Sequence, residues 1–220
     1  MQVRDQWTRQ RDRDHAIWEV TYASGCTLSS YPHPRSAVLA QEPSIVLPKL
    51  LPITEFASLQ FKASRSLSEP AILALFQKLF AWQSECSGYP LLFFTNPKAP
   101  SEIHLITGWE SVEAHEAWIA GERNQELLRV FAPFINILGM VHLDIDFERI
   151  PNDAESMICL KFGEGVGGQV EREIGGHLHW AVVGQNLQDD CHDVCIFMQQ
   201  DGTGLDIEPT LHMELQRVHL

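Results

Sequence analysis

Positive charge is scarce in this chain, which has 16 Lys and Arg residues against 29 Asp and Glu residues and a net charge of −13. Such a chain repels phosphate backbones and anionic lipid, so no nucleic-acid or membrane partner is expected. Long apolar runs are also missing, and no stretch approaches the roughly 18 residues of a membrane span. The first 15 residues are charged and lack an apolar core, so they do not predict a secretory signal.

Cysteine is rare as well, and its spacing indicates no framework of disulfides or metal ligands. Five scattered cysteines predict a reduced, cytoplasmic chain. Cys191 and Cys195, even with His177 and His179, match no standard zinc spacing, so no metal is expected. No nucleotide fingerprint, Ser-His-Asp elbow or calcium loop is visible. Apolar residues nevertheless make up 45% of the chain, which predicts a globular fold with a substantial core.

Three regions are predicted along the chain. Residues 1–50 are expected to form a partly irregular N-terminal arm, because charged residues alternate there and two prolines follow at Pro32 and Pro34. One short strand is expected within the arm, at Trp18–Tyr22. Residues 51–150 are predicted to be an α+β-barrel domain with the ferredoxin-like fold, and residues 151–220 a degenerate second α+β repeat.

The pattern over residues 51–150 changes between the periods of strands and helices. Strands are predicted by alternation at Thr54–Ala63, Leu91–Thr95, Ile103–Trp109 and Met140–Phe147. One helix is expected to begin at Ser68-Glu69-Pro70 and to end at Gly88. Another is expected to be capped by Ser111, broken at Gly121 and resumed over Gln125–Phe134. The resulting order, strand–helix–strand–strand–helix–strand, is ferredoxin-like.

The C-terminal region repeats this order imperfectly. Strands are predicted at Met157–Phe162, His179–Asn186, Asp193–Gln199 and Leu211–Val218. Six glycines between Gly163 and Gly176 favour a flexible loop or lid, so this copy is expected to have lost a helix. Residues 141–145 (VHLDI) and 211–215 (LHMEL) share a pattern, which we interpret as an internal repeat.

The stretch Gly108–His115 (GWESVEAH), followed by the strand Met140–Asp144, resembles the antibiotic-biosynthesis-monooxygenase and stress-responsive families of dimeric α+β barrels. The resemblance is greatest to fungal members, many of them encoded among secondary-metabolite genes. It implies that two units pack sheet to sheet, as a homodimer or a tandem repeat, around a cavity. Members include cofactor-free oxygenases of aromatic polyketides, polyketide cyclases, decarboxylases and haem-degrading enzymes, so the fold does not fix the chemistry.

Residues 119–125 depart from two of these groups. Haem-degrading members have an iron-binding histidine in this segment, and plant-type cyclases have a catalytic one, whereas this chain has none. The resemblance therefore implies no haem and no other cofactor. A cyclase of this kind would need a different base.

His142 and Asp144 are the predicted catalytic residues. Side chains two apart on a strand point the same way. Val141 and Leu143, with Ile145 and Phe147, are expected to face the helices, so His142, Asp144 and Asp146 are expected to face the cavity. A neutral imidazole beside a carboxylate is a competent general base. The alternative is that these polar groups only satisfy one another at a wet interface.

Five further residues are predicted around the substrate. Ser58, Gln60 and His104 are expected on the same face as His142, where they would hydrogen-bond a developing enolate. Trp109 could stack on an aromatic ligand, although a core position is the alternative. His115 is predicted to be a helix residue packed near the sheet edge, with a substrate contact as the alternative. His212 and Glu214 repeat the geometry of His142 and Asp144, which we interpret as a structural echo.

The predicted function is cofactor-independent proton transfer on an aromatic or polyketide-like metabolite, meaning cyclisation, isomerisation or decarboxylation. One alternative is a cofactor-free monooxygenase of a phenolic polyketide. Another is a non-catalytic ligand-binding or stress-related barrel. A cavity of about 300 Å³ or more beside His142 would support the enzyme.

Overall fold

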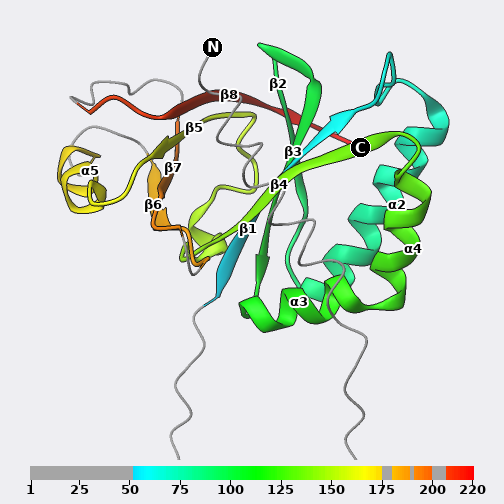
Figure 1. Cartoon of the computed structure of the whole chain (residues 1–220), viewed down its shortest axis with the longest axis horizontal. Coiled ribbons are helices and arrows are strands. Elements are labelled where there is room, and N and C mark those ends of the chain that lie inside the picture. Colours follow the sequence, from blue (N-terminus) through cyan, green and yellow to red (C-terminus); the bar gives the residue numbers. More distant parts are fainter. Residues whose placement is uncertain (1–51, 175–179, 189–190, 200–206) are drawn as a thin grey trace, which may run out of the picture.

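The computed structural model describes residues 52–174, 180–188, 191–199 and 207–220, so the predicted N-terminal arm and its strand lie outside it. Among the described helices, none has the length and hydropathy that a membrane crossing requires. Figure 1 shows the elements. In chain order they are β1 (Ile53–Phe61), α2 (Pro70–Ser87), β2 (Leu92–Asn96), β3 (Ala99–Trp109), α3 (Val112–Ala120), α4 (Glu122–Phe131), β4 (Ile135–Leu143), the 3-10 turn η1 (Phe147–Arg149), β5 (Ser156–Phe162), α5 (Gly167–Ile174), β6 (Ala181–Gln185), β7 (Val194–Met198) and β8 (Leu211–Val218).

The strands form one sheet in the order β4-β1-β3-β2-β8-β5-β7-β6. The first four and the last four have the same internal order, because β5, β6, β7 and β8 take the places of β1, β2, β3 and β4. Antiparallel pairing of β2 with β8 joins the two halves. The predicted α+β fold with two tandem units is therefore confirmed.

The two outer edges of this sheet meet along a seam between β4 and β6. Leu143 forms an antiparallel bridge with Asn186. The Asp144 amide donates to the Gln185 carbonyl at 3.1 Å, and the Leu187 amide donates to the His142 carbonyl at 2.8 Å. The chain thus closes its own barrel, a point on which the sequence left both a tandem and a homodimer open.

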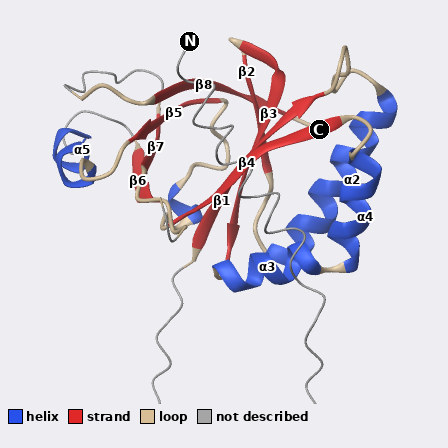
Figure 2. Ribbon diagram, in the orientation of Figure 1, coloured by secondary structure: helices blue, strands red, loops and turns tan. Residues whose placement is uncertain are grey.

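Figure 2 shows the helices lying against the strands. Three apolar clusters hold these layers together. Helices α2, α3 and α4 cover the outer face of the first half-sheet through side chains such as Phe76, and we call this region the helix–sheet layer. The barrel interior lies between the two half-sheets and includes Phe56 and Phe197. Helix α5 packs Val170 on the outer face of the second half-sheet. The half-sheets are therefore apolar on both faces.

The helix ends follow the chemistry of their sequences. Gly88 ends α2 in the left-handed conformation with φ 78°, and its amide donates to the Ser84 carbonyl at 3.0 Å. The hydroxyl of Ser111 accepts from the Ala114 amide at 3.2 Å and caps α3, as predicted. Ser68 does not cap α2, because Glu69 occupies the N-cap position and Ser68 bonds to Ser66 instead.

Two other elements differ from the prediction. Strand β4 begins at Ile135, five residues early, and ends at Leu143, because Asp146 caps η1 beyond it. The glycine-rich segment contains α5, so its helix is not lost. Burial of Val170 stabilises this helix despite the low helix propensity of glycine.

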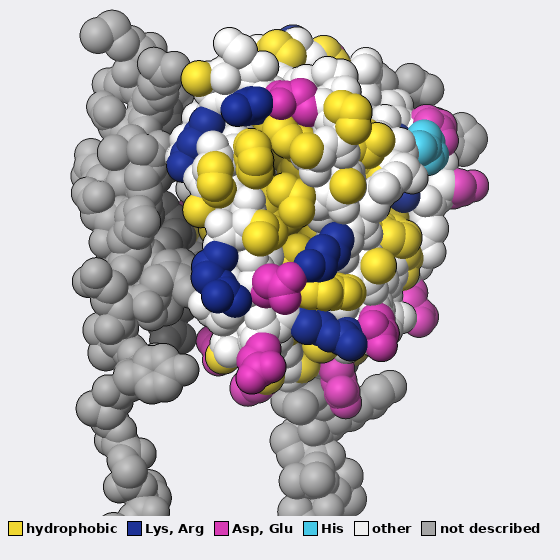
Figure 3. Space-filling model, turned by 90° about the vertical axis from the view of Figure 1, so that its right-hand side faces the viewer, with side chains coloured by type: hydrophobic (Ala, Val, Ile, Leu, Met, Phe, Trp, Pro, Cys, Tyr) yellow, Lys and Arg dark blue, Asp and Glu magenta, His cyan; other side chains and the backbone are white. Residues whose placement is uncertain are grey.

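The outer surface of the helices is mixed in character. Figure 3 shows this side of the molecule, where apolar side chains lie among Lys, Arg, Asp and Glu side chains. Phe80 on α2 is 43% exposed. Lys78 and Arg123 lie over the ring of Trp82, with Nζ and Cζ at 4.1 and 5.6 Å from its centroid. These cations shield part of the apolar surface of α2 from water.

Candidate functional site

The two faces of β4 are the reverse of the prediction. Val141 and Leu143, followed by Ile145 and Phe147, lie in the barrel interior. His142 points into the helix–sheet layer, where its Nε2 lies 2.6 Å from Nδ1 of His115. The prediction that His142 faces a cavity is therefore wrong. The pattern misleads because the barrel interior is as apolar as the layer beneath the helices, so alternation alone does not distinguish the two faces.

Asp144 does not pair with His142 either. Its side chain is exposed, and Oδ1 accepts a hydrogen bond from the Gln185 amide across the seam. Asp146 accepts from the Glu148 amide at 3.1 Å instead of facing a cavity. The predicted dyad is thus absent, and the contact made by Asp144 supports barrel closure.

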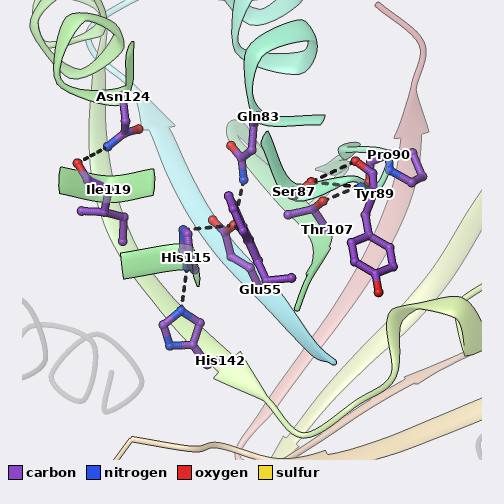
Figure 4. Close-up of polar contacts among 11 residues, drawn as sticks. Glu55, Gln83, Ser87, Tyr89, Pro90, Thr107, His115, Ile119, Asn124 and His142 are labelled. Carbon is purple, nitrogen blue, oxygen red and sulfur yellow. Dashed lines mark hydrogen bonds and ion pairs between the residues drawn. The ribbon is translucent and has the colours of Figure 1, made fainter. Parts of the chain in front are cut away.

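His142 belongs to a buried polar group in the helix–sheet layer, which we call the Glu55 cluster: Glu55, Gln83, Trp109, His115 and His142 (Figure 4). Oε2 of Glu55 accepts from Gln83 Nε2 and from Trp109 Nε1, both at 2.8 Å. The same oxygen lies 3.3 Å from Nε2 of His115. One assignment of protons satisfies this series of contacts: His142 Nε2–H donates to His115 Nδ1, and His115 Nε2–H points to Glu55.

Burial controls the protonation of the Glu55 cluster. It raises the pKa of Glu55 to about 7, although Trp109, His142 and Gln83 act in the opposite direction. It also lowers the pKa of His115 to about 3 and that of His142 to about 4. Both imidazoles are therefore neutral at pH 7. With the Trp109 ring stacked on His115 at 4.6 Å between centroids, the cluster is a polar core that fixes α3 to the sheet.

Ser58 and His104 meet on the other side of the sheet, in the barrel interior. Ser58 Oγ lies 2.9 Å from His104 Nδ1, and the ring of Phe56 stacks on the imidazole. His104 is 1% exposed, and its Nε2 has no hydrogen-bond partner. Oε2 of Glu102 lies 3.8 Å from this nitrogen, which is beyond hydrogen-bond distance. Burial lowers the pKa of His104 to about 4, so this imidazole is neutral with one nitrogen free.

Arg217 lies in the same row of the sheet and was not predicted. Phe94 on β2 is in register with His104 on β3 and with Arg217 on β8, so all three point into the barrel. Nε and Nη1 of Arg217 are buried without a hydrogen-bond partner, and Cζ lies 5.3 Å from the Phe94 ring centroid. We call Ser58, His104, Phe94 and Arg217 the inner polar row. The sequence could have indicated Arg217, because its positive charge interrupts the apolar alternation of β8.

The sheet thus divides the predicted site residues between its two faces. Ser58 and His104 come together as expected, and the half-buried Gln60 follows them on the inner face. Trp109 and His115 lie with His142 on the helix side. In the second unit, His212 is opposite Leu160, whereas His142 is opposite Glu55. The second copy therefore lacks the acid that the first cluster is built around.

As lined by the described residues, the barrel interior has little free space. One void of about 10 Å³, enough for roughly one water molecule, is lined by Phe56, Val141, Cys159, Lys161, Asn186, Cys195 and Leu211. His142 does not line it, so the void gives no support to a cavity of 300 Å³ beside that residue. Within the described ranges, no group of His, Cys, Asp and Glu side chains is arranged to hold a metal ion. His177 and His179 lie outside those ranges.

Comparison with protein-family models and with curated proteins finds no match to this chain. Solved structures do match its fold. A candidate monooxygenase from Fusobacterium nucleatum has a TM-score of 0.53 and 10% identity, covering 77% of this chain and 93% of that chain. A candidate monooxygenase from Lactobacillus acidophilus has a TM-score of 0.52 and 12% identity, covering 76% and 94%.

A candidate chlorite dismutase also matches, with a TM-score of 0.52 and 12% identity, covering 76% of this chain and 95% of that chain. Each alignment extends over more of the chain than either unit contains, so it includes both units. At these identities the likeness concerns the fold alone. The chain shares the ferredoxin-like α+β-barrel fold of these structures, with both units in one polypeptide.

Proposed function

We propose that this protein is a cofactor-independent enzyme that transfers a proton on a small aromatic or polyketide-like metabolite, with His104 as the base. One observation carries the proposal: a buried, neutral imidazole whose Nε2 has no partner faces the barrel interior. Cyclisation, isomerisation and decarboxylation all begin with, or pass through, such a transfer. The base differs from the His142 of the sequence prediction, because His142 faces the helices.

The neighbours of His104 suit this role. When Nδ1–H donates to Ser58 Oγ, the lone pair of Nε2 is free to accept a proton from an acidic C–H or O–H group. The carboxylate of Glu102, 3.8 Å from Nε2, would stabilise the imidazolium that results. Arg217, two strands from His104, supplies N–H donors for an anionic group of the substrate.

The proposal requires a substrate to reach His104 through the end of the barrel. Gln60, Glu102 and Arg217 are partly exposed there, while His104 and Phe94 beneath them are 1% and 0% exposed. Binding a metabolite requires these rim side chains to move aside, since the described interior is closely packed. The proton transfer would then take place beside His104 and Phe94, in a buried region from which water is excluded.

A second candidate is the non-catalytic barrel, which the close packing of the interior favours. In that case the inner polar row would be a feature of the core, and the protein would act through its surface. The two candidates differ in what substitution of His104 does to metabolism.

The test uses strains that lack the gene and are complemented with wild type, His104→Gln or His142→Gln. We expect one intermediate to accumulate without the gene and with His104→Gln, but not with wild type. His142→Gln at the same folded amount is expected to restore the wild-type metabolite profile, because His142 lies on the other face. Oxygen uptake by purified protein supplied with the accumulated intermediate would identify a monooxygenase.

Two results would contradict the proposal. A normal metabolite profile with His104→Gln would remove His104 from catalysis and favour the non-catalytic barrel. Accumulation with His142→Gln alone, at a melting temperature equal to that of the wild type, would return the base to His142.

A further inference from the structure

Arg217 is a half-buried cation whose loss of water is only partly compensated, by the charge of Glu155 and by the Phe94 ring 5.3 Å from Cζ. A guanidinium stays charged at every physiological pH, and burial of its N–H groups without acceptors is unfavourable. Yet Nε and Nη1 are buried and unpaired. An arrangement of this kind is expected where the acceptor is supplied by a ligand.

Among the described acids, Glu155 acts on the charge of Arg217, but no carboxylate forms an ion pair with it. Both carboxylate oxygens of Glu155 lie 3.2 Å from Nε2 of His219. Glu102 lies beside His104, and its own partial burial raises its pKa. Neither carboxylate is within ion-pair distance of Arg217, although the chain carries an excess of 13 negative charges. The Nε and Nη1 donors of Arg217 therefore have no acceptor among these acids.

The inner polar row also sets the size and shape of such a ligand. His104 and Arg217 flank Phe94 on adjacent strands, so they are separated by two strand spacings, or roughly 10 Å between Cα atoms. Phe56 and Phe197 make the surrounding surface aromatic. A flat ring system lying along this row, beside the guanidinium that lies over the Phe94 ring, would place one end at Arg217 and the other at Nε2 of His104.

We propose, on the basis of the function proposed above, that the substrate is a planar aromatic acid whose carboxylate binds Arg217 while its acidic hydrogen faces His104. A carboxylate is the anion that matches a guanidinium best, because its two oxygens accept from two nitrogens at once. The protein would thus recognise its substrate by charge at one end and deprotonate it at the other.

The test measures binding of 2-naphthoate and of its neutral counterpart, 2-naphthamide, to the full chain by isothermal titration calorimetry at low salt. We expect wild type to bind the acid at least about tenfold more tightly than the amide. Arg217→Gln is expected to reduce this ratio to about one. Arg129→Gln, a substitution of an exposed arginine on α4, is the matched control and is expected to keep the ratio.

Arg217→Lys tests the inference if Arg217→Gln does not fold. It keeps the charge and removes the planar fork, so an intermediate ratio is expected. The inference is overturned by equal affinity of wild type for the acid and the amide, by binding of neither probe, or by an unchanged ratio in the folded Arg217 variants.

The inference and the proposed function can fail separately. If His104→Gln disturbs metabolism but acid and amide bind equally, the enzyme stands and the substrate class is wrong. If Arg217 confers acid selectivity but His104→Gln leaves metabolism unchanged, the barrel binds aromatic acids without catalysis.

Discussion

At the scale of single residues, the Glu55 cluster shows how burial sets protonation. Three donors converge on one oxygen of Glu55, which favours the carboxylate, whereas its burial favours the neutral acid. Burial is the larger effect, because it raises the pKa from 4.5 to about 7. His115 and His142, with lowered pKa values, stay neutral beside it.

The titration of Glu55 makes stability depend on pH. Because its pKa is higher in the folded chain, its contribution is fully present below about pH 4.5 and is lost as the pH rises through about 7. His115 and His142 act in the opposite sense: their contributions are present above about pH 6.5 and are lost as the pH falls through about 4 for His142 and about 3 for His115. Substitution of Glu55 removes only the first effect.

We therefore expect Glu55→Gln to gain stability relative to wild type as the pH rises from 4.5 to 8, by about 3 kcal/mol from the size of the pKa change. The amide oxygen of glutamine can still accept from Gln83 and Trp109. Urea denaturation across this pH range measures the difference. Glu116→Gln, on the exposed side of α3, is the control and is expected to show no such trend. A constant difference for Glu55→Gln would show that Glu55 does not titrate in this range.

At the scale of elements, the seam between β4 and β6 depends on one glycine. A Cβ at Gly184 would lie 2.8 Å from Asp144 Oδ1 and even closer to Ile145 Cγ1. Gly184→Ala is thus expected to push the segment after β4 away from β6 and to destabilise the protein by about 1–3 kcal/mol. Denaturant midpoints measure this loss. Faster hydrogen exchange at the Asp144 and Leu187 amides, the donors at the seam, is expected as well.

Gly168 on α5 is the matched control for Gly184. Its added Cβ would meet nothing within 4 Å. Gly168→Ala is expected to be neutral or to stabilise by up to about 1 kcal/mol, because alanine favours the helix. If Gly184→Ala were as stable as Gly168→Ala, the seam would not be a tight contact in solution.

The elements also show where sequence patterns succeed. Strand β8 begins and ends where alternation predicts it, and Ser111 and Gly88 mark helix ends as their chemistry requires. Prediction fails at α5, because tertiary burial of Val170 outweighs a run of glycines. It also fails at β4, whose first residues carry no clear alternation and pair with β1 past an irregularity near Ser58.

At the scale of the whole molecule, each unit covers the inner face of the other. Without β5–β8, residues such as Phe94, Leu143 and Phe56 would be exposed, and β2 and β4 would be unpaired edges. A fragment of residues 52–150 is therefore expected to form dimers or aggregates. Light scattering after size exclusion measures this against the 52–220 chain. A folded, monomeric 52–150 fragment would show that the first unit needs no partner.

The sequence alone determined the α+β class, most strands, the signs of an internal repeat and the polar residues worth testing, because these follow from local periodicity, turn chemistry and residue type. Tertiary structure decided which way β4 faces, that the barrel closes within one chain, and that Arg217 joins Ser58 and His104 in one row. The physical reason is that both faces of a barrel strand are buried. Alternation reveals two faces, but only packing against specific neighbours decides which face meets the helices and which meets the interior.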